Sequence, residues 1–333
     1  MSLLDVKNLE TVFKTDGGEV QAVRNVSFKL EAGEALGIVG ESGSGKSQMM
    51  YSIIGLLAEN GVVKSGDVTF NGQNISRNQF TNKKDYDNFM KEIRGNTMAM
   101  IFQDPMTFLN PVLKIETQLI EPMLNHTDMT KAQAREHALD LMRKVGIPEP
   151  EKRITQYPFE FSGGMRQRIV IAIALANNPK LIIADEPTTA LDVTIQAQVL
   201  ELIADMKDES NSAIIMITHD LGVVAKLCDR IAIMYGGKIV EIGSDKDIFY
   251  DPKHPYTEGL LARISNPEED EEEDLTPIPG SPPDLLNPPK GCPFVDRCNK
   301  AMRVCKDYEP EVTEVSAGHQ CACWLLDRRA VRK

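Results

Sequence analysis

Residues 40–47, which read GESGSGKS, have the residue types and the spacing of a phosphate-binding loop, GxxxxGK[ST]. Glycines let backbone N–H groups curl around phosphate oxygens, and the helix that follows adds a positive dipole end. Lys46 is expected to reach the β- and γ-phosphates of a nucleotide, and the Ser47 hydroxyl to bind Mg²⁺. The residues predicted to contact the nucleotide are Gly40, Ser42, Gly43, Ser44, Gly45, Lys46 and Ser47.

Two carboxylates, Asp185 and Glu186, follow a hydrophobic strand that we predict over residues 181–184. They would then lie at the C-terminal edge of a parallel sheet, where nucleotides bind in such folds. A strand that ends in Asp-Glu is more often a solvated edge, but the phosphate-binding loop in the same chain favours a functional role. We expect Asp185 to help hold Mg²⁺ and Glu186 to polarise the attacking water.

A second helix start in the chain could also face phosphate. Residues 161–168 read FSGGMRQR, and a Ser-Gly-Gly start exposes N–H groups at the positive end of a helix. A plain N-cap that touches no ligand is the alternative. With this segment, the chain resembles the ATP-binding subunits of ABC transporters, whose LSGGQ-like loop lies shortly before the acidic strand. Phe161 and Met165 stand at its first and fifth positions, a variant familiar from the peptide importer branch.

The resemblance implies roles for four further residues. Gln103 would sense the γ-phosphate and the membrane partner and would contribute to Mg²⁺ binding. His219 would be the switch histidine that holds Glu186 and the γ-phosphate in register. Asp192 would contact the opposite subunit at the nucleotide, and Phe13 would stack on adenine, although a phenylalanine on a strand is ordinarily part of the core.

The resemblance also implies a dimer of ATPase domains with two ATP molecules between them. Each ATP would be held by Lys46 and Ser47 of one subunit and by Ser162, Gly163 and Gly164 of the other. Three longer stretches indicate the oligopeptide and dipeptide importers and the related nickel importers. They are QDPMTFLNP at residues 103–111, DEPTTALDVT at 185–194 and HPYTEGLL at 254–261.

The function implied by this branch is ATP hydrolysis that powers the import of dipeptides or oligopeptides through a multi-subunit transporter. The implied partners are two transmembrane permease subunits, a second ABC ATPase that is a paralogue or another copy of this chain, and, indirectly, an external peptide-binding protein. The chain would lie peripherally on the cytoplasmic face of the plasma (inner) membrane. The alternative is a soluble, non-transport ABC ATPase that acts on nucleic acid or ribosomes.

The C-terminal part contains five of the six cysteines in a pattern, GCPFVDRC, AMRVC and GHQCAC, that resembles the tail of these importer ATPases. In that tail four cysteines can hold a 4Fe-4S cluster. The ligands would be Cys292, Cys298, Cys305 and Cys323, with Cys321 as the alternative fourth ligand. Iron-sulfur ligation by four thiolates is chemically reasonable in a reducing compartment. Zinc, or no metal, are the other interpretations.

Hydrophobic patterns predict the elements that position these residues. Short β-branched runs at residues 35–39, 181–184 and 213–218, separated by helical stretches, are typical of buried parallel strands. Alternating apolar residues at 20–30 and a turn at 69–72 predict an antiparallel sheet, and residues 111–146 are mostly helical. We therefore predict an α/β fold, an ABC-type nucleotide-binding domain with a P-loop parallel-sheet core, an antiparallel β subdomain, an inserted helical subdomain and a small Cys-rich C-terminal module.

Composition sets the remaining limits. The 333 residues carry a net charge of −12, and without the acidic run at 268–274 they carry 37 basic against 42 acidic side chains. This charge argues against a general nucleic-acid binder. The longest apolar run, 169–176, is too short to span a bilayer, and the N-terminus lacks the features of a secretory signal, so we expect a reducing cytosol. The predicted domains are an ATPase domain at 1–262 with a helical subdomain at about 104–165, an acidic, Pro-rich linker at 263–290, and the module at 291–333.

Overall fold

The chain divides into two compact units. The computed structural model describes residues 2–103, 108–188, 193–262 and 278–329. The first unit contains residues 1–30, 35–79 and 217–333, and the second contains residues 31–34 and 80–216. The acidic run at 268–274 and Asp192 lie outside the described residues.

The first unit contains a four-stranded antiparallel sheet. Its strands are β1 (Leu4–Thr15), β2 (Gly18–Leu30), β4 (Gly61–Phe70) and β5 (Gln73–Asn74), in the order β2-β1-β4-β5. The predicted strand at 20–30 is β2. The predicted turn joins β4 to β5, with positive φ angles of 48° at Asn71 and 78° at Gly72. The register places Leu4 opposite Leu30, and both side chains are buried.

The first unit also contains five strands in the order β11-β12-β10-β9-β3. They are β3 (Ala35–Val39), β9 (Arg230–Tyr235), β10 (Lys238–Ser244), β11 (Thr313–Ser316) and β12 (His319–Cys321). The pair β3 and β9 is parallel, whereas β10 pairs antiparallel with both β9 and β12. The tail hairpin β11–β12 therefore extends the same set of strands that includes β3.

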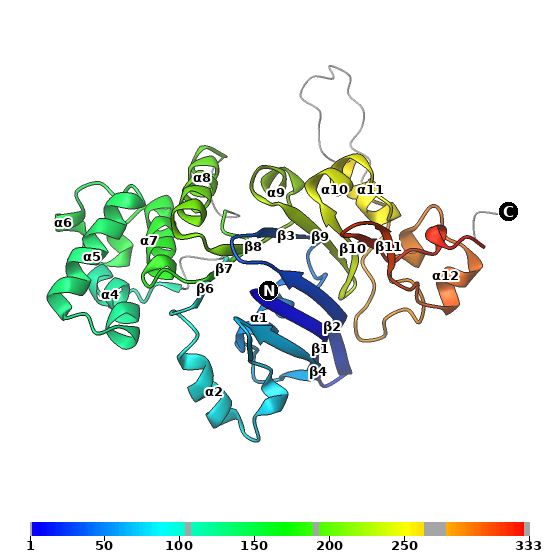
Figure 1. The fold of residues 1–333 in the computed structure, drawn as a ribbon, viewed down its shortest axis with the longest axis horizontal. Helices are drawn as coiled ribbons and strands as arrows, with labels where there is room; N and C mark the ends of the chain where they lie inside the picture. The colour runs from blue at the N-terminus through cyan, green and yellow to red at the C-terminus, as the bar shows by residue number, and fades with distance from the viewer. Residues whose placement is uncertain (1, 104–107, 189–192, 263–277, 330–333) are drawn as a thin grey trace, which may run out of the picture. The chain divides into compact units, whose positions relative to one another are not determined.

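The helices of the first unit flank these strands (Figure 1). They are α1 (Lys46–Ile54), α9 (Leu221–Leu227), α10 (Asp245–Tyr250), α11 (Pro255–Leu261) and α12 (Arg303–Asp307). Helix α1 contacts β1 and β2, and α10 contacts β9 and β10. The described part of the Pro-rich segment, 278–290, also contacts this unit, because the Gln21 N–H donates to the Leu285 carbonyl at 2.8 Å.

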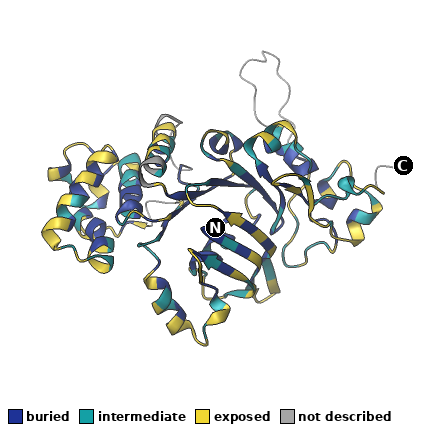
Figure 2. Ribbon diagram, viewed as in Figure 1, coloured by how far each residue is buried: buried dark blue, intermediate teal, exposed yellow. Residues whose placement is uncertain are grey.

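The second unit combines three strands with helices. Its strands are β6 (Met98–Ile101), β7 (Leu181–Asp185) and β8 (Ala213–Thr218), in the order β8-β7-β6, and the last residues of β8 pass into the first unit. Every residue of β6, β7 and β8 is buried (Figure 2), as expected for strands covered on both faces. The strands predicted at 35–39, 181–184 and 213–218 are thus present as β3, β7 and β8.

The helices of the second unit include the predicted helical region at 111–146. They are α2 (Lys83–Lys91), α4 (Ile115–His126), α5 (Lys131–Lys144), α6 (Pro150–Arg153), α7 (Gly163–Leu175) and α8 (Val193–Ser210). The N-cap of α5 is Thr130, which forms a capping box with Gln133. Helices α4, α5 and α7 pack against one another. Within the described ranges, no helix has both the length and the apolar character needed to cross a membrane.

Candidate functional site

The loop at residues 40–47 lies between β3 and α1, as the phosphate-binding pattern predicts. Gly45, immediately before α1, has a φ angle of 100°, and a Cβ atom placed on it would lie 2.2 Å from the Ala22 carbonyl oxygen. Gly43 has a φ angle of 79° and an open surrounding. Both positions therefore favour glycine, the first by sterics and backbone angle and the second by backbone angle.

Lys46 folds back over this loop. Its Nζ donates hydrogen bonds to the carbonyl oxygens of Gly40 at 2.8 Å and Glu41 at 3.1 Å, and the residue is 5% exposed. The Ser44 hydroxyl is also buried, and it has no hydrogen-bond partner among the described residues. Buried hydroxyls are normally paired, so this one indicates a place for an acceptor or donor from a ligand. An ammonium group and a buried hydroxyl in one loop suit a phosphate group.

In the second unit, the structure brings Gln103 and Glu186 together. Strands β6 and β7 are parallel, and Ile101 pairs with Ala184, so both strands end at the same edge. The Gln103 Nε2 donates to Glu186 Oε2 at 2.9 Å. Asp185, the last residue of β7, is only 1% exposed.

Glu186 has a φ angle of 45°, in the left-handed region that non-glycine residues rarely adopt. Such local backbone strain is concentrated at functional sites. The half-buried carboxylate is therefore held in a specific orientation by its backbone and by Gln103, as a residue that orients water would need to be.

The Ser-Gly-Gly segment opens helix α7 as predicted. Ser162 is the N-cap, and its hydroxyl accepts a hydrogen bond from the Met165 N–H at 3.3 Å. Ser162 and Gly163 are exposed, and a Cβ atom placed on Gly163 would meet nothing within 4 Å. The helix start is therefore accessible, which a role in contacting a second molecule requires.

The predicted site residues are divided between the two units. His219 is exposed between β8 and α9, and Phe13 is half-buried on β1 opposite Gly61. Lys46, Ser47, His219 and Phe13 belong to the first unit, whereas Gln103, Asp185, Glu186 and the Ser-Gly-Gly segment belong to the second. Asp192 lies outside the described residues.

The predicted iron-sulfur site is contradicted. The described residues include all five tail cysteines, yet they contain no group of three or more His, Cys, Asp or Glu side chains that could hold a metal ion. The same finding opposes zinc in the tail. The ligands predicted for the cluster were Cys292, Cys298, Cys305 and Cys323, with Cys321 as the alternative.

Burial sets the protonation state of the tail cysteines in the structure. It raises the pKa of Cys292 to about 12 and that of Cys323 to about 11, and it raises the pKa of Cys298 and Cys321 as well. Without a metal ion, these surroundings favour the neutral thiol over the thiolate. Cys321 is in addition part of strand β12, opposite Glu241 of β10. The spacing of cysteines in the sequence carries no information on this burial.

Sequence reasoning missed two residues that touch the phosphate-binding loop. The Tyr256 hydroxyl accepts a hydrogen bond from the Glu41 N–H at 2.9 Å, and Arg297 forms an ion pair with the Glu41 carboxylate. The first belongs to the HPYT segment and the second to the segment GCPFVDRC, so both lay in stretches that the sequence had singled out for other reasons. The only local signal was the acidic residue inside a loop expected to bind anions.

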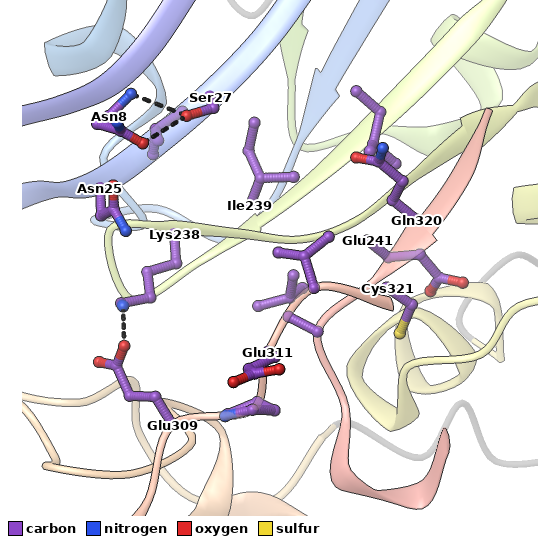
Figure 3. A pocket seen from close by; sticks show the side chains of 16 residues that line it. Asn8, Asn25, Ser27, Lys238, Ile239, Glu241, Glu309, Glu311, Gln320 and Cys321 are labelled. Carbon is purple, nitrogen blue, oxygen red and sulfur yellow. Dashed lines mark hydrogen bonds and ion pairs between the residues drawn. The ribbon is translucent and has the colours of Figure 1, made fainter. Parts of the chain in front are cut away.

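A pocket of about 510 Å³ lies elsewhere in the first unit, between β2, β10 and the tail (Figure 3). Lys238 and Glu309 form an ion pair in its wall at 2.5 Å, and the Asn8 N–H donates to the Ser27 hydroxyl at 2.8 Å. Of the described residues that line it, none belongs to the loop at 40–47. Lys238 in this wall is thus paired with Glu309, and the candidate nucleotide site is built on the loop at 40–47.

Comparison with known proteins gives matches over nearly the whole chain. Residues 23–189 match the ABC transporter family, and residues 240–305 match the C-terminal region of oligopeptide/dipeptide transporters. The oligopeptide transport ATP-binding protein OppD of Bacillus subtilis (strain 168) is 53% identical over 325 residues, 97% of this chain and 89% of the relative. The dipeptide transport ATP-binding protein DppD of the same organism is 52% identical over 98% of this chain and 96% of the relative.

Solved structures match the fold. A dimeric ATP-binding cassette in a post-hydrolysis state, bound to ADP and Pi, superimposes with a TM-score of 0.63. It is 28% identical, and the match covers 72% of this chain and 98% of that chain.

Proposed function

The chain belongs to the ABC transporter family, among the oligopeptide and dipeptide transport ATP-binding proteins, and on this basis we propose that it hydrolyses ATP to power peptide import. The observation that carries this proposal is the similarity to peptide transport ATP-binding proteins over 97% of the chain. The predicted fold, an ABC nucleotide-binding domain, is confirmed by the match to a solved cassette.

The phosphate-binding loop supports the binding of ATP. The N–H groups at the start of α1, the Lys46 ammonium and the buried Ser44 hydroxyl offer hydrogen-bond donors to a triphosphate. Catalysis of phosphoryl transfer depends on positioning and on electrostatic stabilisation of the charge on the transferred group. In our proposal Lys46 offsets that charge, and the other loop residues predicted above hold the phosphates. Phe13 stacks on the adenine ring.

The chain also carries oxygen donors of the kind that Mg²⁺ requires. A hydroxyl, a carboxylate and an amide oxygen are suitable ligands for this hard cation. We propose Ser47, Asp185 and Gln103 for this role, and Gln103 can serve because its amide nitrogen donates to Glu186, which leaves its amide oxygen for a cation. When bound, Mg²⁺ would neutralise part of the charge on the β- and γ-phosphates.

Hydrolysis itself needs a water molecule aligned with the γ-phosphorus. We assign the orientation of this water to Glu186, which Gln103 contacts and whose backbone is held at a positive φ angle. His219 would keep Glu186 and the γ-phosphate in register. Ser162, Gly163, Gly164 and Asp192 would act on the ATP of a second ATPase subunit across the dimer.

The assembly follows from the family. The chain works with two transmembrane permease subunits and a second ATPase subunit, and indirectly with an external peptide-binding protein. We further propose that it lies peripherally on the cytoplasmic face of the membrane. The relatives described above are transport proteins, and no observation on this chain favours the alternative of a soluble ATPase that acts on nucleic acid or ribosomes.

The substitution Glu186→Gln tests this function. In proteoliposomes that contain the permeases and the partner ATPase, the wild-type chain should drive ATP-dependent uptake of a labelled peptide. The variant should bind ATP with unchanged affinity, while hydrolysis and uptake fall about 100-fold, because it loses the group that polarises the water. The control is Glu201→Gln on the exposed part of α8. Normal turnover in Glu186→Gln would remove this residue from its role, and absence of uptake with the wild-type chain would overturn the function.

A further inference from the structure

The tail reaches the phosphate-binding loop through Arg297. Its Nη1 lies 2.5 Å from Glu41 Oε2 and its Nη2 lies 3.1 Å from Glu41 Oε1, so the guanidinium and the carboxylate meet in two parallel hydrogen bonds. The Arg297 side chain is 4% exposed and that of Glu41 is 18% exposed. Two-pronged, charge-assisted pairs that are shielded from water are stronger and more specific than exposed ion pairs.

The other donors of Arg297 are also occupied. Its Nε donates to the Pro279 carbonyl at 2.9 Å, Nη2 to the Ile278 carbonyl at 3.0 Å and Nη1 to the Tyr235 hydroxyl at 3.2 Å. The guanidinium carbon lies 5.7 Å from the centre of the Tyr235 ring. An arginine has five N–H donors, and all five have acceptors here, so its position is fixed by Glu41, by the Pro-rich segment and by β9.

Glu41 links Arg297 to the backbone of the phosphate-binding loop. Its N–H donates to the Tyr256 hydroxyl at 2.9 Å, and its carbonyl accepts from Lys46 Nζ at 3.1 Å. The rings of Tyr235, Tyr256 and Phe294 pack together, with centroids 4.5 to 5.3 Å apart. The side chain, the N–H and the carbonyl of Glu41 thus each have a partner. The partners of the side chain and the N–H, Arg297 and Tyr256, lie in the C-terminal third of the chain.

We propose that Arg297 is a positioning residue that sets the affinity of the phosphate-binding loop for ATP by neutralising Glu41 and fixing its backbone. The inference rests on the proposed function. A carboxylate in a loop that must accept a triphosphate would repel the ligand, and its pairing with Arg297 removes that repulsion. The contact makes the tail part of the nucleotide site.

Nucleotide affinity and turnover of five variants in the full-length chain test the proposal. Arg297→Gln should raise both the Kd of MgATP and the KM about tenfold, the loss expected for one hydrogen bond to a charged group. The kcat at saturating ATP should change less than about twofold, because Arg297 does not touch the reacting atoms. Arg297→Lys, which keeps the charge but cannot form the two parallel hydrogen bonds, should raise the Kd about threefold.

A charge-neutral pair separates this role from general support of the fold. In Glu41→Gln/Arg297→Gln the Kd should return to within about twofold of the wild-type value, because the repelling charge is gone. The matched control is Lys300→Gln, three residues further along, which breaks an ion pair with Glu258 at 2.6 Å that does not touch the loop. Its Kd should equal that of the wild type. Thermal unfolding of every variant checks that it is folded.

Two results would overturn the inference. One is an unchanged Kd of MgATP in Arg297→Gln and Arg297→Lys. The other is a Kd of the double variant that is equal to or higher than that of Arg297→Gln. If Arg297→Gln does not fold, Arg297→Lys and the double variant decide by the same criteria. Lys46→Ala separates this failure from failure of the proposed function. If the wild type binds ATP and Lys46→Ala does not, the function stands whatever Arg297 does.

Discussion

At the residue scale, the Ser44 hydroxyl is the clearest sign that the loop at 40–47 is built for a ligand. It is buried without a hydrogen-bond partner among the described residues, whereas the nearby Lys46 ammonium donates to the carbonyl oxygens of Gly40 and Glu41. A buried, unsatisfied hydroxyl destabilises a folded protein by about 1–3 kcal/mol. This destabilisation can be relieved by phosphate oxygens, and it then contributes to ATP affinity.

The substitution Ser44→Ala should therefore change stability and binding in opposite directions. The free energy of unfolding of the nucleotide-free chain should rise by about 1 kcal/mol, while ATP affinity falls about fivefold. The control is Ser52→Ala in α1, an equally buried serine whose hydroxyl bonds to Thr11 at 2.7 Å and Gln48 at 2.6 Å. The free energy of unfolding of Ser52→Ala should fall by about 1 kcal/mol. Urea unfolding measures both values, and a destabilised Ser44→Ala would contradict the interpretation.

At the scale of elements, one buried carboxylate joins β10, α11 and β12. Glu241, which is 1% exposed, accepts hydrogen bonds from the N–H groups of Lys253 and His254 at 2.7 and 3.0 Å and from the Thr257 hydroxyl at 2.5 Å. The Nε2 of His319 lies 2.8 Å from Glu241 Oε1, the oxygen that also accepts from the Lys253 N–H. These contacts fix the start of α11, which supplies Tyr256 to the phosphate-binding loop. The HPYT segment thus has a structural role in this unit, because it forms the start of α11.

The N-cap of α11 should make stability depend on pH. Burial lowers the pKa of His254 to about 3, so the folded chain keeps this side chain neutral while the unfolded chain protonates it near pH 6.5. Stability is therefore complete above pH 6.5 and decreases as the pH falls. Between pH 7 and pH 5 this one group should remove about 2 kcal/mol of unfolding free energy.

The substitution His254→Asn isolates this term, because asparagine caps a helix but does not titrate. The fall in unfolding free energy from pH 7 to pH 5 should be about 2 kcal/mol smaller in the variant than in the wild type, as measured by urea unfolding at each pH. The comparison uses the change with pH and not the absolute stability, which the substitution also affects. Equal falls in both proteins would show that His254 does not carry the pH dependence.

At the scale of the whole molecule, the proposed sandwich divides each nucleotide site between two subunits. The start of α7 is exposed, and Gly163 has room for a side chain, so the substitution Gly163→Asp should leave the fold intact. An acidic residue in the first turn of a helix is even favourable. Its charge would instead act on the phosphates of the ATP held by the partner subunit.

We expect Gly163→Asp to bind ATP within about twofold of the wild-type affinity, while ATP hydrolysis in the assembled transporter falls more than about tenfold. Lys46→Ala is the contrasting variant, which should lose binding itself. Equilibrium binding to the isolated chain and turnover in proteoliposomes measure the two effects. Loss of binding in both variants would place Gly163 in the site of its own chain.

Much of the fold and of the site could be predicted because contiguous residues encode it. The loop at 40–47, the acidic end of β7 and the N-cap of α7 are short segments whose types and order specify both the local backbone and the chemistry. The strands β3, β7 and β8 follow from hydrophobic runs for the same reason. The cysteine tail failed as a prediction because spacing does not specify how side chains are buried or how they face one another.

The sequence by itself determined that this chain carries an ATPase of the ABC type, since each motif is local. Only the tertiary structure decided which distant side chains touch one another at the site. Gln103 and Glu186 are 83 positions apart, and Arg297 and Glu41 are 256 apart. The second pair exists because β12 joins β10 and the tail packs beside β9, a long-range pairing that no local pattern specifies.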